Sequence, residues 1–157
     1  MSKLQNMRIM EIPKFRAVSS GLKTLEELFG ENGFEKWKSA NRHLIRQAIY
    51  EQPDFMWEEG DKSVWIWAVK DGVTQEDTAP YEIIEFEGGM FLVATGDEND
   101  SGDFSETVNS MFKWIENSDV FEYGGRGMGN MPGGGIIDKA LGIAQQQVFL
   151  SLKLREK

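Results

Sequence analysis

Two glutamates interrupt an otherwise apolar stretch, Tyr81 to Gly96 (YEIIEFEGGMFLVATG), and they are the first residues that could do chemistry. The β-branched and aromatic residues on either side of Gly88-Gly89 predict two strands joined by a tight turn. A carboxylate inside a buried strand costs free energy unless it is paired. We therefore expect Glu82 or Glu85 to be a buried acid that faces a ligand. Glu85 is favoured, because alternation along the strand places it on the face of Tyr81.

Aromatic side chains are the second group that could do chemistry. The sequence has five tryptophans, and Trp65 and Trp67 lie on one face of a strand predicted over 63–69. Such rings can fill a core, but they can also stack on a flat ligand or on a cation. Tyr123 is a further candidate ligand-binding residue. The predicted apolar wall of a binding cleft consists of Trp37, Trp65, Trp67, Tyr81, Phe91, Trp114 and Phe149.

Other catalytic and metal-binding patterns are incomplete in this sequence. The chain has no cysteine, and its one histidine, His43, has no second histidine with which to form a metal site. The glycine-rich stretch Gly124–Gly135 lacks the Gly-Lys-Ser/Thr of a phosphate-binding loop, so the expectation there is a loop, either a mobile flap over the cleft or a plain linker. The acidic stretch Asp97–Asp103 resembles the start of a calcium loop, but Val108 stands where a glutamate is needed. We expect a solvated loop there, no metal site and no cofactor.

The charge balance narrows the class of partner. The 157 residues carry a net charge of −9, which argues against binding to nucleic acid or to an anionic membrane surface, because both need basic residues. No apolar run reaches the roughly 20 residues that span a bilayer. The first residues lack the apolar region of a signal peptide. These features predict a cytoplasmic protein that forms one domain, 1–157.

Hydrophobic periodicity predicts two main helices and a mostly antiparallel sheet. Capping-box spacing at Thr24 and Glu27 opens a short helix that Gly30 closes. The element order resembles two β-α-β-β units, which indicates an α+β fold with both helices on one side of a curved sheet. The main helices are expected over 34–52 and 103–117, and strands over 7–19, 63–69, 81–86, 90–95, 120–123 and 148–154.

Several stretches together resemble the GyrI-like family, which is also called the effector-binding domain of AraC- and MerR-type transcription regulators. MEIPKFRAVSSG resembles its opening strand, and YEIIEFEGGMFLVATG its central hairpin. FKWIENSDVFE resembles its second helix and the corner after it, and QQQVFLSLKL its closing strand. The resemblance covers nearly the whole chain, with no DNA-binding helix-turn-helix, so it implies a standalone version of the domain.

The resemblance implies two pseudo-symmetric halves with a ligand cleft between them. In the family, aromatic rings stack on cationic aromatic molecules there, and a buried glutamate pairs with their charge. Asn130, Gln147 and Ser151 depart from the family pattern. The expected function is the capture of an amphipathic cationic aromatic compound. The alternatives are a hydrolase of strained cyclopropane-type compounds, with Tyr81 or Tyr123 as the acid, and a protein-binding modulator of the gyrase-inhibitor type. The expected partner is thus a small molecule, with a regulator or gyrase as a further possibility.

Overall fold

The computed structural model describes residues 6–48, 52–132 and 135–156. The chain divides into two compact units. Unit 1 consists of Met1–Pro13 and Gly88–Lys157, and unit 2 consists of Lys14–Glu87. The single domain expected over 1–157 stays a prediction.

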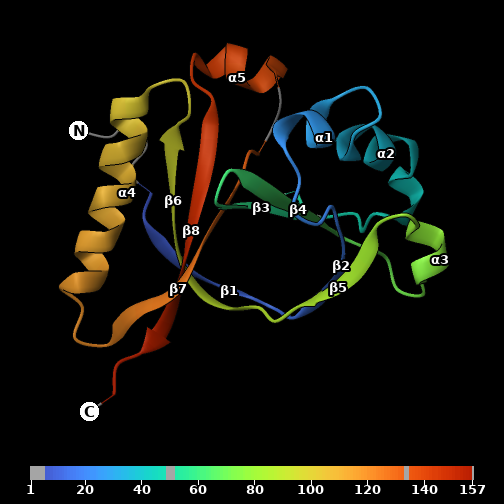
Figure 1. Ribbon diagram of the computed structural model, residues 1–157. Coiled ribbons are helices and arrows are strands. Elements are labelled where there is room, and N and C mark those ends of the chain that lie inside the picture. Colours follow the sequence, from blue (N-terminus) through green and yellow to red (C-terminus); the bar gives the residue numbers. More distant parts are fainter. Residues whose placement is uncertain (1–5, 49–51, 133–134, 157) are drawn as a thin grey trace. The chain divides into compact units, whose positions relative to one another are not determined.

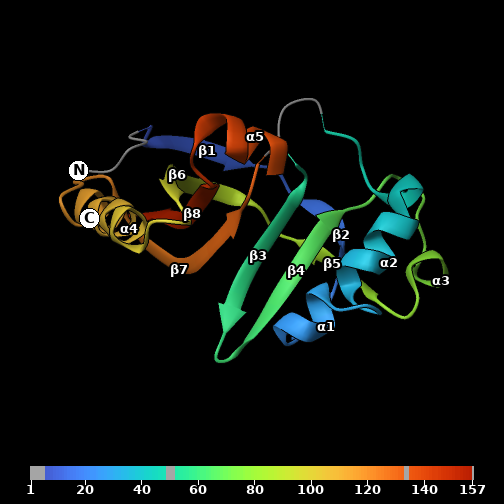
Figure 2. The same cartoon turned by 90° about the horizontal axis from the view of Figure 1, so that it is seen from above.

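Unit 2 is a four-stranded antiparallel sheet with short helices packed on it (Figure 2). Its elements in chain order are β2 (Phe15–Ser19), α1 (Leu25–Phe29), α2 (Phe34–Ala40), the 3₁₀ turn η1 (Arg42–Leu44), β3 (Asp54–Glu59), β4 (Lys62–Ala68), α3 (Gln75–Thr78) and β5 (Glu82–Phe86). The strands lie in the order β3-β4-β2-β5. Leu28 of α1 and Phe34 of α2 are fully buried and pack with Val18, Trp65 and Trp67 of the sheet. The two helices therefore cover one face of the sheet.

Unit 1 is a second four-stranded antiparallel sheet, with one long helix (Figure 1). Its elements are β1 (Arg8–Ile12), β6 (Gly89–Asp97), α4 (Ser101–Glu116), β7 (Phe121–Asn130), α5 (Gly135–Leu141) and β8 (Gln145–Leu154). The strands lie in the order β1-β6-β8-β7. Met111 and Ile115 of α4 are buried against Leu92 of β6 and Leu150 of β8. Of the apolar stripe expected for this helix from the helical period, Phe104, Val108, Met111 and Ile115 face the sheet, whereas Trp114 is exposed.

The two units repeat one topology. In each, a strand leads into the covering helices, and two further strands follow: β2, β3 and β4 in unit 2, and β6, β7 and β8 in unit 1. The first strand of each set lies between the third strand and an added strand, which is β5 or β1. The predicted α+β class is confirmed. The ligand cleft expected between the halves stays a prediction.

The strands expected on either side of Gly88-Gly89 exist, but the predicted hairpin is wrong. β5 pairs with β2, with Ile83 opposite Val18, whereas β6 lies between β1 and β8. Both glycines have the expected positive φ angles, 76° at Gly88 and 129° at Gly89. They lie where the chain passes from unit 2 to unit 1. Alternation and turn residues predict strands well, but they do not specify which strand pairs with which.

The helix predicted over 34–52 is also much shorter. α2 ends at Ala40, and the side-chain amide of Asn41 donates to the Trp37 carbonyl at 2.8 Å. After η1, Ile45 forms a β-bridge with Val69. Ile45, one of the apolar residues that follow the helical period, is therefore buried in an extended segment next to β4, whereas Ala48 is exposed. Residues 49–51 of the expected helix lie outside the described residues.

The glycine-rich stretch expected to be a loop forms most of β7. A β-carbon at Gly124 would lie 2.7 Å from the Ser151 hydroxyl oxygen, and one at Gly129 would lie 2.9 Å from the Gln147 carbonyl oxygen. Only glycine permits β8 to approach so closely, because any side chain would displace the neighbouring strand. Residues 133–134 of the expected loop lie outside the described residues.

The acidic stretch before α4 is a set of caps, and the expectation of a solvated loop is wrong for its two buried members. The side chain of Asp100 accepts a hydrogen bond from the Asp103 backbone N–H at 3.0 Å, so the helix starts at Ser101. The Asp103 carboxylate accepts from the Asp97 N–H at 2.9 Å, and Asp97 accepts from the Ala144 N–H at 3.1 Å. These acids hold backbone donors that would otherwise be unsatisfied.

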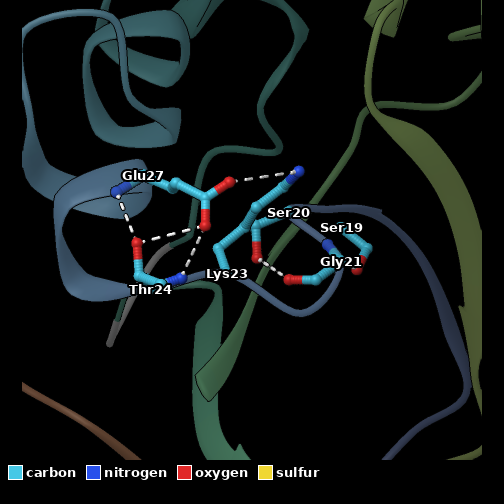
Figure 3. A network of polar contacts seen from close by, with 6 residues as sticks. All are labelled: Ser19, Ser20, Gly21, Lys23, Thr24 and Glu27. Carbon is cyan, nitrogen blue, oxygen red and sulfur yellow. Dashed lines mark hydrogen bonds and ion pairs between the residues drawn. The ribbon is translucent and has the colours of Figure 1, made fainter. Parts of the chain in front are cut away.

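The capping box predicted at Thr24 is confirmed (Figure 3). The Thr24 hydroxyl accepts from the Glu27 N–H, and the Glu27 carboxylate accepts from the Thr24 N–H at 3.1 Å. Lys23 lies 4.0 Å from the same carboxylate. As expected, Gly30 follows the last helical residue.

Smaller differences concern the first strand and the connection before β5. The strand predicted over 7–19 is two strands, β1 and β2, because Pro13 interrupts it. The polar stretch 71–80 contains the short helix α3, which Thr74 caps together with Asp77.

Among the described residues, no helix combines the length and the apolar character that a bilayer crossing requires. The cytoplasmic location stays a prediction.

Candidate ligand-binding site

Five aromatic side chains of unit 2 form one connected cluster: Phe34, Trp37, Trp65, Trp67 and Tyr81. The Tyr81 ring meets Phe34 edge-on at 4.8 Å and Trp37 at 5.2 Å, measured between ring centroids. Trp65 lies 5.7 Å from Phe34 and 5.7 Å from Trp67. Phe34, Trp65 and Trp67 are buried, whereas Trp37 and Tyr81 are half-buried. We call the buried rings Phe34, Trp65 and Trp67 the floor of the cluster, and the half-buried rings Trp37 and Tyr81 its rim.

Three elements position these rings. Trp65 and Trp67 are two residues apart on β4, so both point to the face that the helices cover. Phe34 and Trp37 are three residues apart on α2, which places them on the same helix face. Tyr81 follows α3, and its carbonyl accepts a hydrogen bond from the Thr78 hydroxyl at 2.8 Å. Four of the site residues predicted from the sequence thus come together.

A buried carboxyl belongs to the same cluster. The indole N–H of Trp65 donates to Asp54 Oδ2 at 2.9 Å. Asp54 is 5% exposed, and burial raises the pKa of its carboxyl to about 6, against the opposing effects of the Trp65 hydrogen bond and of nearby Lys38. At pH 7 about nine tenths of such a group is ionised. The cluster therefore contains a desolvated negative charge at neutral pH.

A cation already contacts one ring of the cluster. The ammonium nitrogen of Lys38 lies 4.3 Å from the centroid of the Trp67 ring, which is within cation–π distance. Desolvation lowers the pKa of the Lys38 ammonium, and the charge of Arg42 lowers it further. The Trp67 indole N–H is buried and meets no acceptor among the described residues. An unsatisfied buried donor is costly, and a ligand acceptor could satisfy it.

Neither glutamate expected to be the buried acid is buried. Glu82 is exposed at the start of β5. The side chain of Glu85 is 53% exposed and forms an ion pair with Lys14 at 3.0 Å. Glu85 also lines a pocket of about 310 Å³, together with the cationic side chains of Lys14, Arg16 and Arg46 and the carboxylate of Asp71. The cationic side chains outnumber the carboxylates, so this lining does not favour a further cation. The expectation of a buried glutamate at these positions is therefore wrong.

The other predicted site residues lie in unit 1. Phe91 and Phe149 are almost fully buried, with ring centroids 6.4 Å apart. Trp114 and Tyr123 are 38% and 36% exposed, and Tyr123 meets the ring of Phe112 edge-on. The role of these four residues in ligand binding stays a prediction.

Asp54 is the acid that the sequence patterns missed. The sequence predicts a helix over 34–52 that Pro53 ends, and it predicts no strand at 54–59. A signal was present: Phe55 and Trp57 alternate with other residues, and Gly60-Asp61 can close a two-residue hairpin loop. The structure pairs Glu59 with Lys62 across that loop. Recognising this hairpin would have placed Asp54 opposite Trp67.

Comparisons with known proteins identify the fold. No protein-family model matches the chain, and no curated protein matches it by sequence. Among solved structures, SAV2435 bound to tetraphenylphosphonium matches with a TM-score of 0.60 and 11% identity, over 95% of this chain and 94% of that one. An uncharacterised conserved protein from Listeria innocua matches with a TM-score of 0.66 and 12% identity, over 94% and 92% of the two chains. A hydrolase from Listeria innocua matches with a TM-score of 0.63 and 12% identity, over 94% and 91%. The chain therefore shares their fold.

Proposed function

We propose that this protein binds aromatic cations, and that its binding site is the aromatic cluster of unit 2 with Asp54 as the charge partner. The observation that carries the proposal is the hydrogen bond of 2.9 Å between Trp65 and Asp54. It fixes a buried carboxyl beside the aromatic rings of the cluster. This combination suits a ligand that carries both a positive charge and aromatic rings.

Both parts of the site favour a cation. The faces of Trp37, Trp67 and Tyr81 carry partial negative charge and attract positive groups. Burial penalises the ionised form of Asp54, as its raised pKa of about 6 reflects. A bound cation offsets part of that penalty, because opposite charges attract more strongly in a desolvated site than in water. The net charge of −9 additionally attracts cations from solution.

The fold comparison supports the same ligand class. SAV2435, which has the same fold, was solved with tetraphenylphosphonium, a cation enclosed by four aromatic rings. The motif resemblance to the GyrI-like family points in the same direction. We therefore extend the proposal to membership of that family. Binding to a transcription regulator or to gyrase is a further part of the proposal.

Titration with tetraphenylphosphonium tests the proposal. Calorimetry on the wild-type chain at pH 8 should give saturable binding with a single class of site. Trp37→Leu removes a half-buried ring from the rim and should weaken binding about tenfold, in line with the loss of a cation–π contact. Asp54→Asn keeps the shape of the side chain but removes its charge, and it should weaken binding by about tenfold to a hundredfold.

Two variants serve as matched controls. Trp57→Leu removes a half-buried tryptophan from the opposite face of the same hairpin and should leave the affinity unchanged. Glu85→Gln removes a carboxylate from the basic pocket. An effect of Glu85→Gln with none of Asp54→Asn would move the charge partner to Glu85. Absence of any binding to the wild type would refute the proposed function.

A hydrolase is the second candidate, favoured by one observation. A carboxyl with a pKa of about 6 can accept a proton from water near neutral pH, and a hydrolase from Listeria innocua shares the fold. In this mechanism Asp54 is the general base, and Tyr81, the tyrosine of the cluster, is the candidate acid. Product formation from a cyclopropane-bearing electrophile, lost in Asp54→Asn, would support it. Binding without turnover would leave the first proposal standing.

A further inference from the structure

The position of Lys38 on the Trp67 ring has a consequence for any ligand of the cluster. Lys38 lies on α2, one residue after Trp37, and its ammonium occupies the ring face at 4.3 Å. That is the position in which a cationic ligand would contact Trp67. We propose that Lys38 is a built-in competitor that a cationic ligand must displace, and that it sets the charge selectivity of the site. This inference rests on the function proposed above.

The surroundings of Lys38 hold its ammonium only weakly. No carboxylate of the described residues forms an ion pair with it; Glu35 and Asp54 act on its charge from a distance, and Arg42 repels it. Desolvation lowers the pKa of Lys38, which means that part of its hydration is lost without a close anion to replace it. The ammonium is therefore held on the Trp67 ring without an ion pair among the described residues, so its displacement costs little free energy.

The side chain is also able to leave. Lysine carries its charge on a flexible four-carbon stem that can swing into water. Lys38 is half-buried at the rim of the cluster, beside Trp37. Rotation about its side-chain bonds would uncover the face of Trp67, while the buried neighbours Trp65 and Phe34 stay in place. The buried rings are thus in place before a ligand binds, and only the Lys38 side chain has to move.

The exchange predicts a specific pattern of affinities. A cationic ligand gains the Trp67 contact but replaces the one that Lys38 made, so part of the gain cancels. An anion of the same shape meets Lys38 as an attractive charge instead. Removal of the ammonium should therefore strengthen binding of the cation and weaken binding of the anion. For a partly desolvated cation–π contact the expected change is roughly fivefold to thirtyfold.

Calorimetric titration of the full chain with two isosteric probes tests this inference. Tetraphenylphosphonium and tetraphenylborate have nearly the same shape and opposite charge. Lys38→Met keeps the alkyl stem and should bind the phosphonium roughly fivefold to thirtyfold more tightly than the wild type, and the borate more weakly. Lys38→Gln is a second neutral variant that should agree with it. Lys36→Met removes a lysine from an exposed position of the same helix, and it should change neither affinity.

The outcomes separate the inference from the proposed function. Thermal unfolding of each variant reports whether it is folded before titration. Equal phosphonium affinity in the wild type and both Lys38 variants, or weaker binding in the variants, would overturn the competitor role while leaving cation binding intact. Tighter phosphonium binding in Lys36→Met as well would reduce the effect to net charge and also overturn it. No phosphonium binding by any variant would refute both.

Discussion

Replacement of Asp54 by asparagine tests the energetic cost of the buried charge on which the proposed site depends. Burial raises the pKa of Asp54 from 3.8 to about 6. For an acid, this means that the folded chain holds more protons than the unfolded chain between those two pH values. The free energy of unfolding should therefore fall as the pH rises through this window. Asparagine cannot titrate and still offers an oxygen to the Trp65 indole.

The magnitude follows from the shift of the pKa. A pKa shift of about two units means that the free energy of unfolding differs by about 3 kcal/mol between the fully protonated and the fully ionised group. Over the accessible range from pH 8 to pH 5, the wild type should gain about 1.4 kcal/mol from this group. Asp54→Asn should gain nothing from it. Other groups titrate in both proteins, so their contributions cancel in the difference between the two curves.

Urea unfolding at pH 5, 6, 7 and 8 provides the measurement. The stability difference between the wild type and Asp54→Asn should shift by about 1.4 kcal/mol across this series, in favour of the wild type at low pH. Asp61→Asn removes the same charge from an exposed position in the turn of the same hairpin and serves as the control. Parallel curves for wild type and Asp54→Asn would show that burial does not oppose the ionisation of Asp54.

Three further predictions follow from the same structure. Trp65→Phe keeps a ring but removes the donor to Asp54, and its free energy of unfolding in urea at pH 8 should be about 1–3 kcal/mol lower; a loss equally large at pH 5 would contradict this cause. The affinity for tetraphenylphosphonium should fall by up to about tenfold from pH 8 to pH 5 as Asp54 takes up a proton, and calorimetry on Asp54→Asn should show no such fall. Gly129→Ala forces a β-carbon toward the Gln147 carbonyl and should cost about 1–3 kcal/mol in thermal unfolding, whereas Gly102→Ala in the first turn of α4 should be nearly neutral.

Local signals in the sequence predicted local structure well. The capping box at Thr24 needs only residues three positions apart, and the apolar stripe of α4 repeats within a few turns. Both appear as expected because the interactions that fix them lie within the same short segment. The α+β class follows from such signals, since it depends on the order of elements and not on their pairing.

Sequence patterns whose structure depends on distant partners gave wrong predictions. The Gly88-Gly89 turn predicts a hairpin, yet the partner of β5 is β2 and the partners of β6 are β1 and β8. The glycines of β7 resemble a loop until β8 is placed against Gly124 and Gly129. Tertiary contacts decided both cases, and no local pattern contains them.

The candidate site was half predictable for the same reason. The alternation at Trp65 and Trp67 places two rings on one face of a strand, and that pattern is visible in the sequence. The acid is expected from the sequence where glutamates interrupt an apolar strand, but Glu85 of that strand pairs with Lys14 at the surface. Asp54 becomes a candidate only when β3 is recognised and set against β4, because its burial comes from that neighbour.

The division of the chain has a consequence for the order in which it folds during synthesis. Unit 2 is one uninterrupted segment, 14–87, so all of its strands are synthesised before β6. β1 emerges earlier, but its residue Arg8 pairs with Val93, which is translated much later. Closing so long a loop is entropically costly and slow. We expect nascent chains stalled near residue 120 to protect unit 2 from proteolysis while residues 8–12 are still cut; early protection of both would contradict this order. The strand that is translated first is thus expected to be among the last to find its place.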